Sequence, residues 1–213
     1  MLGVDTVAVI DFETTGLSPA RGDRPTEIAA VLVAEGRIVD RYQSLMNAGL
    51  FVPPFIERLT GISTAMLRRA PPVEQVMAEV ADFVGTVPLV AHNAAFDSKF
   101  WDAELSRLGR QRSQSFVCTL LLARRVLPRA PSYKLGALVD SFGLPAAEPA
   151  HRALADAEMA SHLMLRLEQE LIEQFQCAAV THDLLRRIQR MPKSQLQTRL
   201  AGEGRGLPIR AEL

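Results

Sequence analysis

Apolar residues along this chain follow two different spacings, which predict strands first and helices later. Residues 4–12 form a β-rich apolar run, and two more such runs flank the turn at Glu35-Gly36, as in a hairpin. From residue 73 onward the apolar positions recur with the helical period, and this first long helix is expected to stop at Gly85. Strands followed by alternating strands and helices predict an α/β fold with a mixed sheet flanked by helices.

The remaining elements are predicted largely from the positions of proline and glycine, which tend to end helices and strands. We expect short helices within 52–63 and 63–72, a strand within 87–92, a helix capped by Asn93 and ended by Gly109, a strand running into a helix within 115–128, a short helix ending at Gly143, and the longest helix at 154–175. Residues 177–191 favour one more helix, and 193–213 favour a loose tail. The main domain is therefore placed at 1–175, and a C-terminal helical extension with its tail at 176–213.

Composition narrows the range of partners. The 213 residues are 48% hydrophobic, which suits one globular domain with a full core. Basic and acidic residues number 24 each, so no global basic field for holding long nucleic acid is expected. The stretches 99–134 and 186–210 are locally basic, and we expect both to be ordinary solvated faces.

Targeting and redox signals are few. The cysteines Cys118 and Cys177 show no disulfide or metal spacing, which favours a reducing, cytoplasmic compartment. Neither a signal peptide nor an apolar run of membrane-spanning length is evident, so no membrane partner is expected.

The first candidate site lies in "AVIDFETTGLSP", residues 8–19. Asp11 and Glu13 are two apart on a strand, so they share one face while Phe12 points into the opposite, apolar face. A hard divalent cation offsets the repulsion between two such carboxylates. The following "TTG" predicts a tight turn with free N–H and hydroxyl donors beside them. Solvation of both acids at the strand exit is the alternative that the pattern leaves open.

Two further clusters carry candidate chemistry. In "AHNAAFD", Asp97 falls in the first turn of a helix that follows a strand, where the helix dipole by itself favours an acid. In "HRALADAE", His151 and Asp156 would lie about 140° apart on a single helix and could not share a site. With His151 in the loop before the helix, they can. We expect the other histidines, His92, His162 and His182, to be structural.

A phosphatase signature competes for the first motif. Asp-x-Asp-x-Thr at a strand end is typical of phosphohydrolases with an aspartate nucleophile, and "DFETT" differs from it by Glu13. That chemistry also needs a lysine and a further acidic pair, and no convincing set is found along the chain.

Together, "DFETTGL", "HNAAFD" and "HRALADA" resemble the three signature motifs of the DEDDh 3′–5′ exonucleases, in order and in approximate separation. This family includes the proofreading epsilon subunit of bacterial DNA polymerase III and ribonuclease T. "LTGIS" and "YKLGAL" are similar to secondary signals of the family. The resemblance covers about residues 4–170, and none of the five signature residues is missing. It implies a ribonuclease-H-like fold with a five-stranded mixed sheet, and makes residues 1–175 the exonuclease domain.

The resemblance also implies site roles. Asp11, Glu13, Asp97 and Asp156 would hold two divalent cations, Mg²⁺ or Mn²⁺, and His151 would be the general base. Thr14, Thr15 and Gly16 would hold the terminal nucleotide, and Leu17 and Phe96 would pack on its bases. The implied reaction releases nucleoside 5′-monophosphates from 3′ ends.

Several alternatives remain open at this point. The substrate would be single-stranded DNA or RNA, so an exoribonuclease is one alternative, and a catalytically silent module that binds nucleic-acid ends is another. A DNA polymerase subunit and a second copy of the chain are both open as partners. Because the motifs end at Asp156, residues 177–213 are expected to be dispensable for chemistry.

Overall fold

The protein is described by a computed structural model at residues 6–146, 151–192 and 196. The elements in chain order are β1 (Val7–Thr14), η1 (Pro19–Arg21), β2 (Pro25–Ala34), β3 (Arg37–Leu45), α1 (Pro54–Thr60), α2 (Thr64–Leu67), α3 (Val73–Val84), β4 (Leu89–Ala91), α4 (Ala94–Arg107), β5 (Phe116–Cys118), α5 (Thr119–Val126), α6 (Leu135–Phe142), α7 (Ala153–Phe175) and α8 (His182–Arg190). The predicted order of strands and helices is confirmed.

The strands form a five-stranded mixed sheet in the order β3-β2-β1-β4-β5. The first three strands are antiparallel meander neighbours, whereas β4 runs parallel to β1 and β5 runs parallel to β4. The expected fold class, a ribonuclease-H-like α/β fold with helices on both sides of a five-stranded mixed sheet, is confirmed. The parallel pairing places the carboxyl ends of β1 and β4 at the same edge of the sheet.

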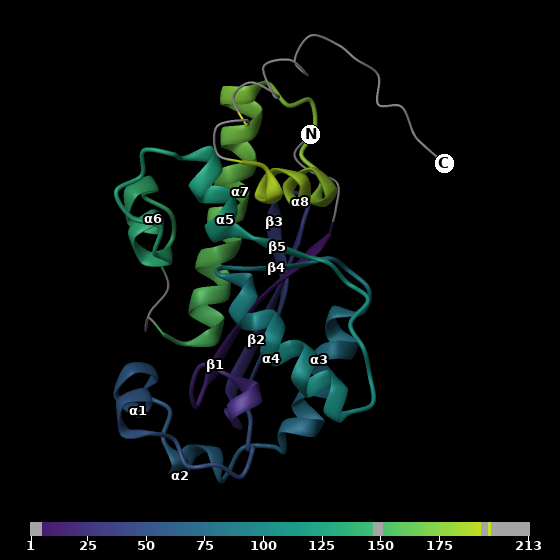
Figure 1. The fold of residues 1–213 in the computed structure, drawn as a ribbon, viewed down its shortest axis with the longest axis vertical. Coiled ribbons are helices and arrows are strands. Elements are labelled where there is room, and N and C mark those ends of the chain that lie inside the picture. Colours follow the sequence, from purple (N-terminus) through teal and green to yellow (C-terminus); the bar gives the residue numbers. More distant parts are fainter. Residues whose placement is uncertain (1–5, 147–150, 193–195, 197–213) are drawn as a thin grey trace.

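Alternation along β1 sends successive side chains to two separate cores, as expected for a strand buried on both faces. Val7 and Val9 face the core formed with α5, α6, α7 and α8, whereas Ala8, Ile10 and Phe12 face the core formed with α3 and α4. Figure 1 shows α7 running along the sheet and α3 with α4 next to its lower part. Asp11 and Glu13 therefore point to the side covered by α7, while Phe12 packs against Phe100 and Trp101.

Asn93 occupies the N-cap position of α4 as predicted, but its side chain makes no capping hydrogen bond. Its backbone has φ +67°, a left-handed conformation that asparagine tolerates. The predicted ends at Gly85, Gly109 and Gly143 agree with the structure, because each has positive φ immediately after a helix or its cap.

The C-terminal helix α8 packs into the same core as the sheet. Leu184, Leu185 and Ile188 are buried there with residues of α5 and α7. The Gln189 side chain also pairs with the edge strand β5, because its Oε1 accepts from the Cys118 N–H at 2.7 Å and its Nε2 donates to the Phe116 carbonyl at 3.0 Å. The helix predicted within 177–191 is confirmed, and the predicted tail, apart from Leu196, lies outside the described residues.

No helix within the described ranges combines the length and the apolar character needed to cross a bilayer. Cys118 and Cys177 form no disulfide with each other.

Candidate active site

Asp11 and Glu13, the first acidic pair, lie in the part of β1 beyond its pairing with the parallel strand β4. β4 ends at Ala91, so the last residues of β1 face the beginning of α4 instead of a strand. Asp97 in the first turn of α4 is 1% exposed, and its Oδ1 accepts a hydrogen bond from the Phe12 N–H at 3.2 Å. This bond holds Asp97 next to the segment that carries Asp11 and Glu13. Two distant motifs of the sequence are thereby brought together.

The third motif approaches the same place from α7. His151 lies just before the helix and Asp156 in its first turn. One potential ligand atom from each of Glu13, His151 and Asp156 lies within 4.8 Å of the others. The Asp156 carboxylate also accepts a hydrogen bond from the His151 backbone N–H. The expectation that a loop histidine and a helical aspartate can share a site is confirmed, whereas their chemical roles remain a prediction.

Burial raises the pKa of every carboxyl group in this cluster, and repulsion by neighbouring carboxylates adds to the effect at Asp11 and Glu13. The pKa of Asp11 lies well above its ordinary value, first because burial removes its hydration and then because of the negative charges of Asp97, Asp156 and Glu13. The same causes raise the pKa of Glu13 to about 8. Burial raises the pKa of Asp97 to about 7, and it raises that of Asp156 against the opposing effect of His151. Such a cluster needs compensating positive charge to be fully ionised.

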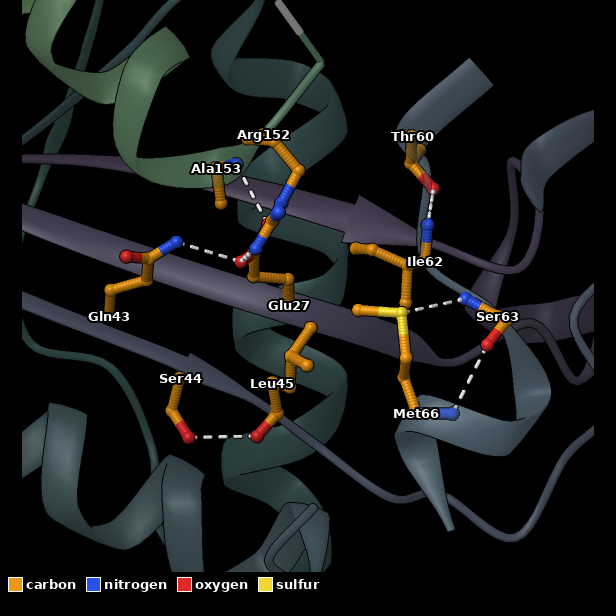
Figure 2. A network of polar contacts seen from close by, with 10 residues as sticks. All are labelled: Glu27, Gln43, Ser44, Leu45, Thr60, Ile62, Ser63, Met66, Arg152 and Ala153. Carbon is orange, nitrogen blue, oxygen red and sulfur yellow. Dashed lines mark hydrogen bonds and ion pairs between the residues drawn. The ribbon is translucent and has the colours of Figure 1, made fainter. Parts of the chain in front are cut away.

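A fifth acid, Glu27, lies directly opposite Glu13 in the antiparallel pair of β1 and β2, and the sequence analysis missed it. Its side chain is fully buried. Its carboxylate accepts two hydrogen bonds from Arg152, at 2.6 and 3.0 Å, and one from Gln43 Nε2 at 2.8 Å. The signal was present in "TEIAAV", where an acid opens an otherwise apolar strand. Figure 2 shows Gln43 and Arg152 converging on Glu27.

Glu27 also fixes where α7 begins. Arg152 occupies the N-cap position, but its side chain makes no cap bond to the helix. Instead Glu27 Oε2 accepts from the Ala153 N–H at 3.0 Å, so a carboxylate of β2 satisfies a free donor at the start of α7 (Figure 2). Asp156 lies one turn further along the helix, so this contact sets its position relative to β1.

The turn after Glu13 differs from its prediction in one respect. The Thr14 hydroxyl donates to the Gly16 carbonyl at 2.6 Å, and the Thr15 N–H donates to the Arg24 carbonyl at 2.9 Å. The expectation of free donors is therefore wrong for these two groups, because the turn uses them to close on itself. A Cβ on Gly16 would lie 2.5 Å from the Asp23 carboxylate, so only glycine permits this packing.

Two apolar side chains border this turn and α4. Leu17 is 77% exposed, and its carbonyl accepts from Lys99 Nζ at 3.1 Å. Phe96, one residue before Asp97, packs on Phe100 and lies under the Lys99 ammonium. Lys99 connects the two residues, because its ammonium contacts both the Leu17 carbonyl and the Phe96 ring.

Two of the other histidines contact backbone carbonyls of the fold, and the structural role expected for all three stays a prediction. His92 contacts the Thr119 hydroxyl at 2.9 Å and the Tyr133 carbonyl at 3.1 Å, and burial lowers its pKa to about 4. His182 is buried, with Nε2 3.3 Å from the Leu89 carbonyl. Burial also lowers the pKa of His162.

Comparisons with known proteins agree with this geometry. The RNase_T family model, described as "Exonuclease", matches residues 8–164. The chain is 40% identical over 164 residues to the 3′-5′ exonuclease DinG of Bacillus subtilis (strain 168), covering 76% of this chain and 18% of DinG. It is 35% identical over 167 residues to the DNA polymerase III subunit epsilon of Aquifex aeolicus (strain VF5), covering 78% of this chain and 82% of that subunit.

A solved structure of exonuclease X in complex with 5′ overhanging duplex DNA has the same fold. It superposes with a TM-score of 0.68 at 26% identity, covering 86% of this chain and 99% of that chain. The matched family region contains the three acidic motifs and the histidine brought together above. The resemblance to the DEDDh exonucleases is thus confirmed, and the chain belongs to the RNase_T exonuclease family.

Proposed function

We propose that this chain is a metal-dependent 3′–5′ exonuclease that hydrolyses the terminal phosphodiester of nucleic acid and releases nucleoside 5′-monophosphates. The observation that carries the proposal is the convergence of Glu13, His151 and Asp156 within 4.8 Å, with Asp97 close enough to Asp11 to raise its pKa. The family match favours this function over the phosphatase alternative.

The residues present fit divalent cations. The donors assigned to the cations are carboxylate oxygens, the ligands that hard cations such as Mg²⁺ and Mn²⁺ prefer, whereas the His151 imidazole is assigned to proton transfer. Neighbouring carboxylates raise the pKa of Asp11 and of Glu13, so bound cations would favour the ionised forms of both groups. Asp11, Glu13, Asp97 and Asp156 would hold two cations, which supply positive charge beside the scissile phosphate and the attacking water.

His151 would accept the proton of the attacking water. Its side chain is exposed, so water reaches the ring, and its backbone N–H is held by the Asp156 carboxylate. The backbone at His151 has φ +59°, a left-handed conformation that is uncommon for residues other than glycine and costs some strain. Such strain at a loop residue beside four acids is typical of a functional position.

The terminal nucleotide would lie against the turn after β1. Thr14, Thr15 and Gly16 shape that turn, and Leu17 and Phe96 would contact the base, where stacking contributes roughly 1–3 kcal/mol per base. The likeness to a DNA polymerase III subunit and to a DNA-bound exonuclease favours DNA as the substrate and a polymerase as a partner. Two cysteines that form no disulfide with each other favour a cytoplasmic location.

The experiment uses oligonucleotides labelled at the 5′ or the 3′ end, of DNA and of RNA, with Mg²⁺, Mn²⁺ or EDTA. We expect 3′-labelled mononucleotide to be released first from DNA, and only with a cation. Asp156→Asn should abolish this release, while Glu158→Gln, an acid on the same helix outside the cluster, should not. Release from the 5′ end, or full activity in EDTA, would refute the proposal. Faster hydrolysis of RNA would replace the substrate, and binding without hydrolysis would favour the silent module.

A further inference from the structure

A buried ion pair joins the turn after β1 to helix α4. The Arg24 guanidinium donates to both carboxylate oxygens of Glu104, through Nε at 2.6 Å and through Nη2 at 2.7 Å. The Glu104 side chain is 2% exposed and the Arg24 side chain 13%. Exposed side chains make longer contacts with the pair, Glu74 at 3.5 Å from Arg24 and Arg107 at 3.8 Å from Glu104. The bidentate contact, with its two short bonds, is therefore the one that fixes the geometry.

Helix α4 connects this pair to the acidic cluster. Glu104 lies about two helical turns after Asp97, so the two side chains leave the same face of α4. Asp97 accepts from the Phe12 N–H in β1, and Glu104 accepts from the residue that precedes β2. Two acids of one helix thus hold the chain on both sides of the turn that joins β1 to β2.

The backbone of Arg24 closes the turn itself. Its carbonyl accepts from the Thr15 N–H at 2.9 Å, and its N–H donates to the Thr15 hydroxyl at 3.1 Å. Inside the turn, the Asp23 carboxylate accepts from the Ser18 N–H at 2.9 Å. Because α4 holds the Arg24 side chain and the turn holds its backbone, a displacement of the guanidinium is transmitted to Thr15.

The energetics favour a geometric role for this pair over a stabilising one. Burial removes the hydration of both charges, and replacing a buried ion pair by well-packed apolar residues is often neutral or stabilising. A guanidinium that bonds both oxygens of a carboxylate fixes their distance and their orientation together. Here it fixes the place proposed for the terminal nucleotide relative to the helix that carries Asp97.

We propose that Arg24 is a positioning residue, which acts through Glu104 to align the turn that holds the terminal nucleotide with the cation ligand Asp97. Arg24 and Glu104 themselves contact neither the nucleotide nor the cations in this arrangement. The inference rests on the proposed exonuclease function and adds the contact that aligns the substrate with the chemistry. Alignment is decisive because a misplacement of about 1 Å at the reacting atoms costs about 10²-fold in rate.

Two substrates separate this alignment from the chemistry at phosphorus. The p-nitrophenyl ester of thymidine 5′-monophosphate presents a nucleoside to the turn, whereas bis(p-nitrophenyl) phosphate has the same leaving group and no nucleoside. Arg24→Lys keeps the charge but loses the bidentate contact. We expect this variant to lower kcat for the thymidine ester about 10- to 100-fold, as for a misplacement of up to about 1 Å. The rate with bis(p-nitrophenyl) phosphate should fall much less, and the Mn²⁺ affinity should be retained.

A matched control and a second variant distinguish positioning from a general loss of structure. Arg112→Lys removes another bidentate pair on α4, because Arg112 donates to both oxygens of Asp102, at 2.7 and 3.0 Å. Its kcat for the thymidine ester should match that of the wild type. Glu104→Gln should lower this kcat as Arg24→Lys does, and the double variant should lose no more than the larger single effect, because the two residues act as one unit.

Urea unfolding of each variant gives the folded fraction, since a merely structural pair would lower both rates in proportion to it. Equal losses on the two substrates, an equal loss in Arg112→Lys, or additive losses in the double variant would overturn the inference. Should the wild type hydrolyse neither substrate, the proposed function fails. Calorimetry of thymidine 5′-monophosphate binding with Mn²⁺ then decides the inference, because Arg24→Lys should weaken that binding and Arg112→Lys should not.

Discussion

We expect the loss of Arg152 to destabilise the fold more than the loss of the charge on Glu27, although the two side chains form one ion pair. Glu27 is fully buried, whereas the Arg152 side chain is 28% exposed. Arg152→Ala leaves a buried carboxylate with only two neutral donors, the Ala153 N–H and Gln43 Nε2. Removing one partner of a buried pair costs about 3–5 kcal/mol, so we expect a loss of unfolding free energy in this range.

The reverse substitution should cost less. In Glu27→Gln the amide oxygen can still accept from Ala153, and the Arg152 guanidinium can turn toward water. We expect a loss of about 1–3 kcal/mol, the cost of disturbed hydrogen bonds. Since a change of 1 kcal/mol shifts the melting temperature of a chain of this size by roughly 2–4 °C, Arg152→Ala should melt about 6–20 °C lower than the wild type.

Urea unfolding at pH 7 measures both free energies. Arg41→Ala is the matched control, because Arg41 pairs with Glu158 of the same helix at the surface, where such pairs contribute about 0–1 kcal/mol. Both site variants should also lower turnover at temperatures where they remain folded, because the start of α7 sets the position of Asp156. If Glu27→Gln costs as much as Arg152→Ala, or if Arg41→Ala matches either, the reasoning from burial is refuted.

Three further predictions concern the site and the C-terminal helix. His151→Gly should lower kcat about 10²–10⁴-fold, because the general base is lost. The melting temperature should stay the same or rise, because glycine adopts φ +59° without strain. A near-normal kcat would exclude the role of His151 as the base. Without divalent cations the melting temperature should fall as pH rises from about 5 to about 8, because the raised pKa values of Glu13 and Asp97 mean that the folded state binds protons that the unfolded state has released. Adding Mn²⁺ should raise the melting temperature most at pH 8. A melting temperature that does not change with pH would contradict the raised pKa values. Gln189→Ala should lose about 1–3 kcal/mol in urea unfolding through its two bonds to β5, and unchanged stability would show that α8 does not hold this edge.

The contacts of α8 affect how the expectation that residues 177–213 are dispensable for chemistry can be tested. No residue of α8 lies in the acidic cluster, but α8 buries Leu184, Leu185 and Ile188 and pairs with β5. A truncation at 176 would therefore expose the edge strand β5, and the site lies on the same sheet. A loss of hydrolysis in such a variant should be compared with its loss of folded protein.

The sequence alone determined the order of the elements and the identity of the signature residues. Alternation along β1 predicted that Asp11 and Glu13 share a face while Phe12 enters the opposite core, and the structure agrees. The loop before α7 predicted that His151 and Asp156 can meet, and they do. Both inferences succeed because side-chain direction and helix boundaries depend on residues that are neighbours in the chain.

Only the tertiary structure decided which polar groups are buried and what they contact. An acid at the start of an apolar strand marked Glu27 as unusual, but its partner could not be found from the sequence, because Arg152 lies 125 positions away. The free donors expected at Thr14 and Thr15 are taken by Gly16 and Arg24 once the turn closes. The raised pKa values and the pair of Arg24 with Glu104 likewise arise from packing between distant segments. Burial and ion pairing depend on which elements pack against one another, and the local sequence pattern does not specify this packing.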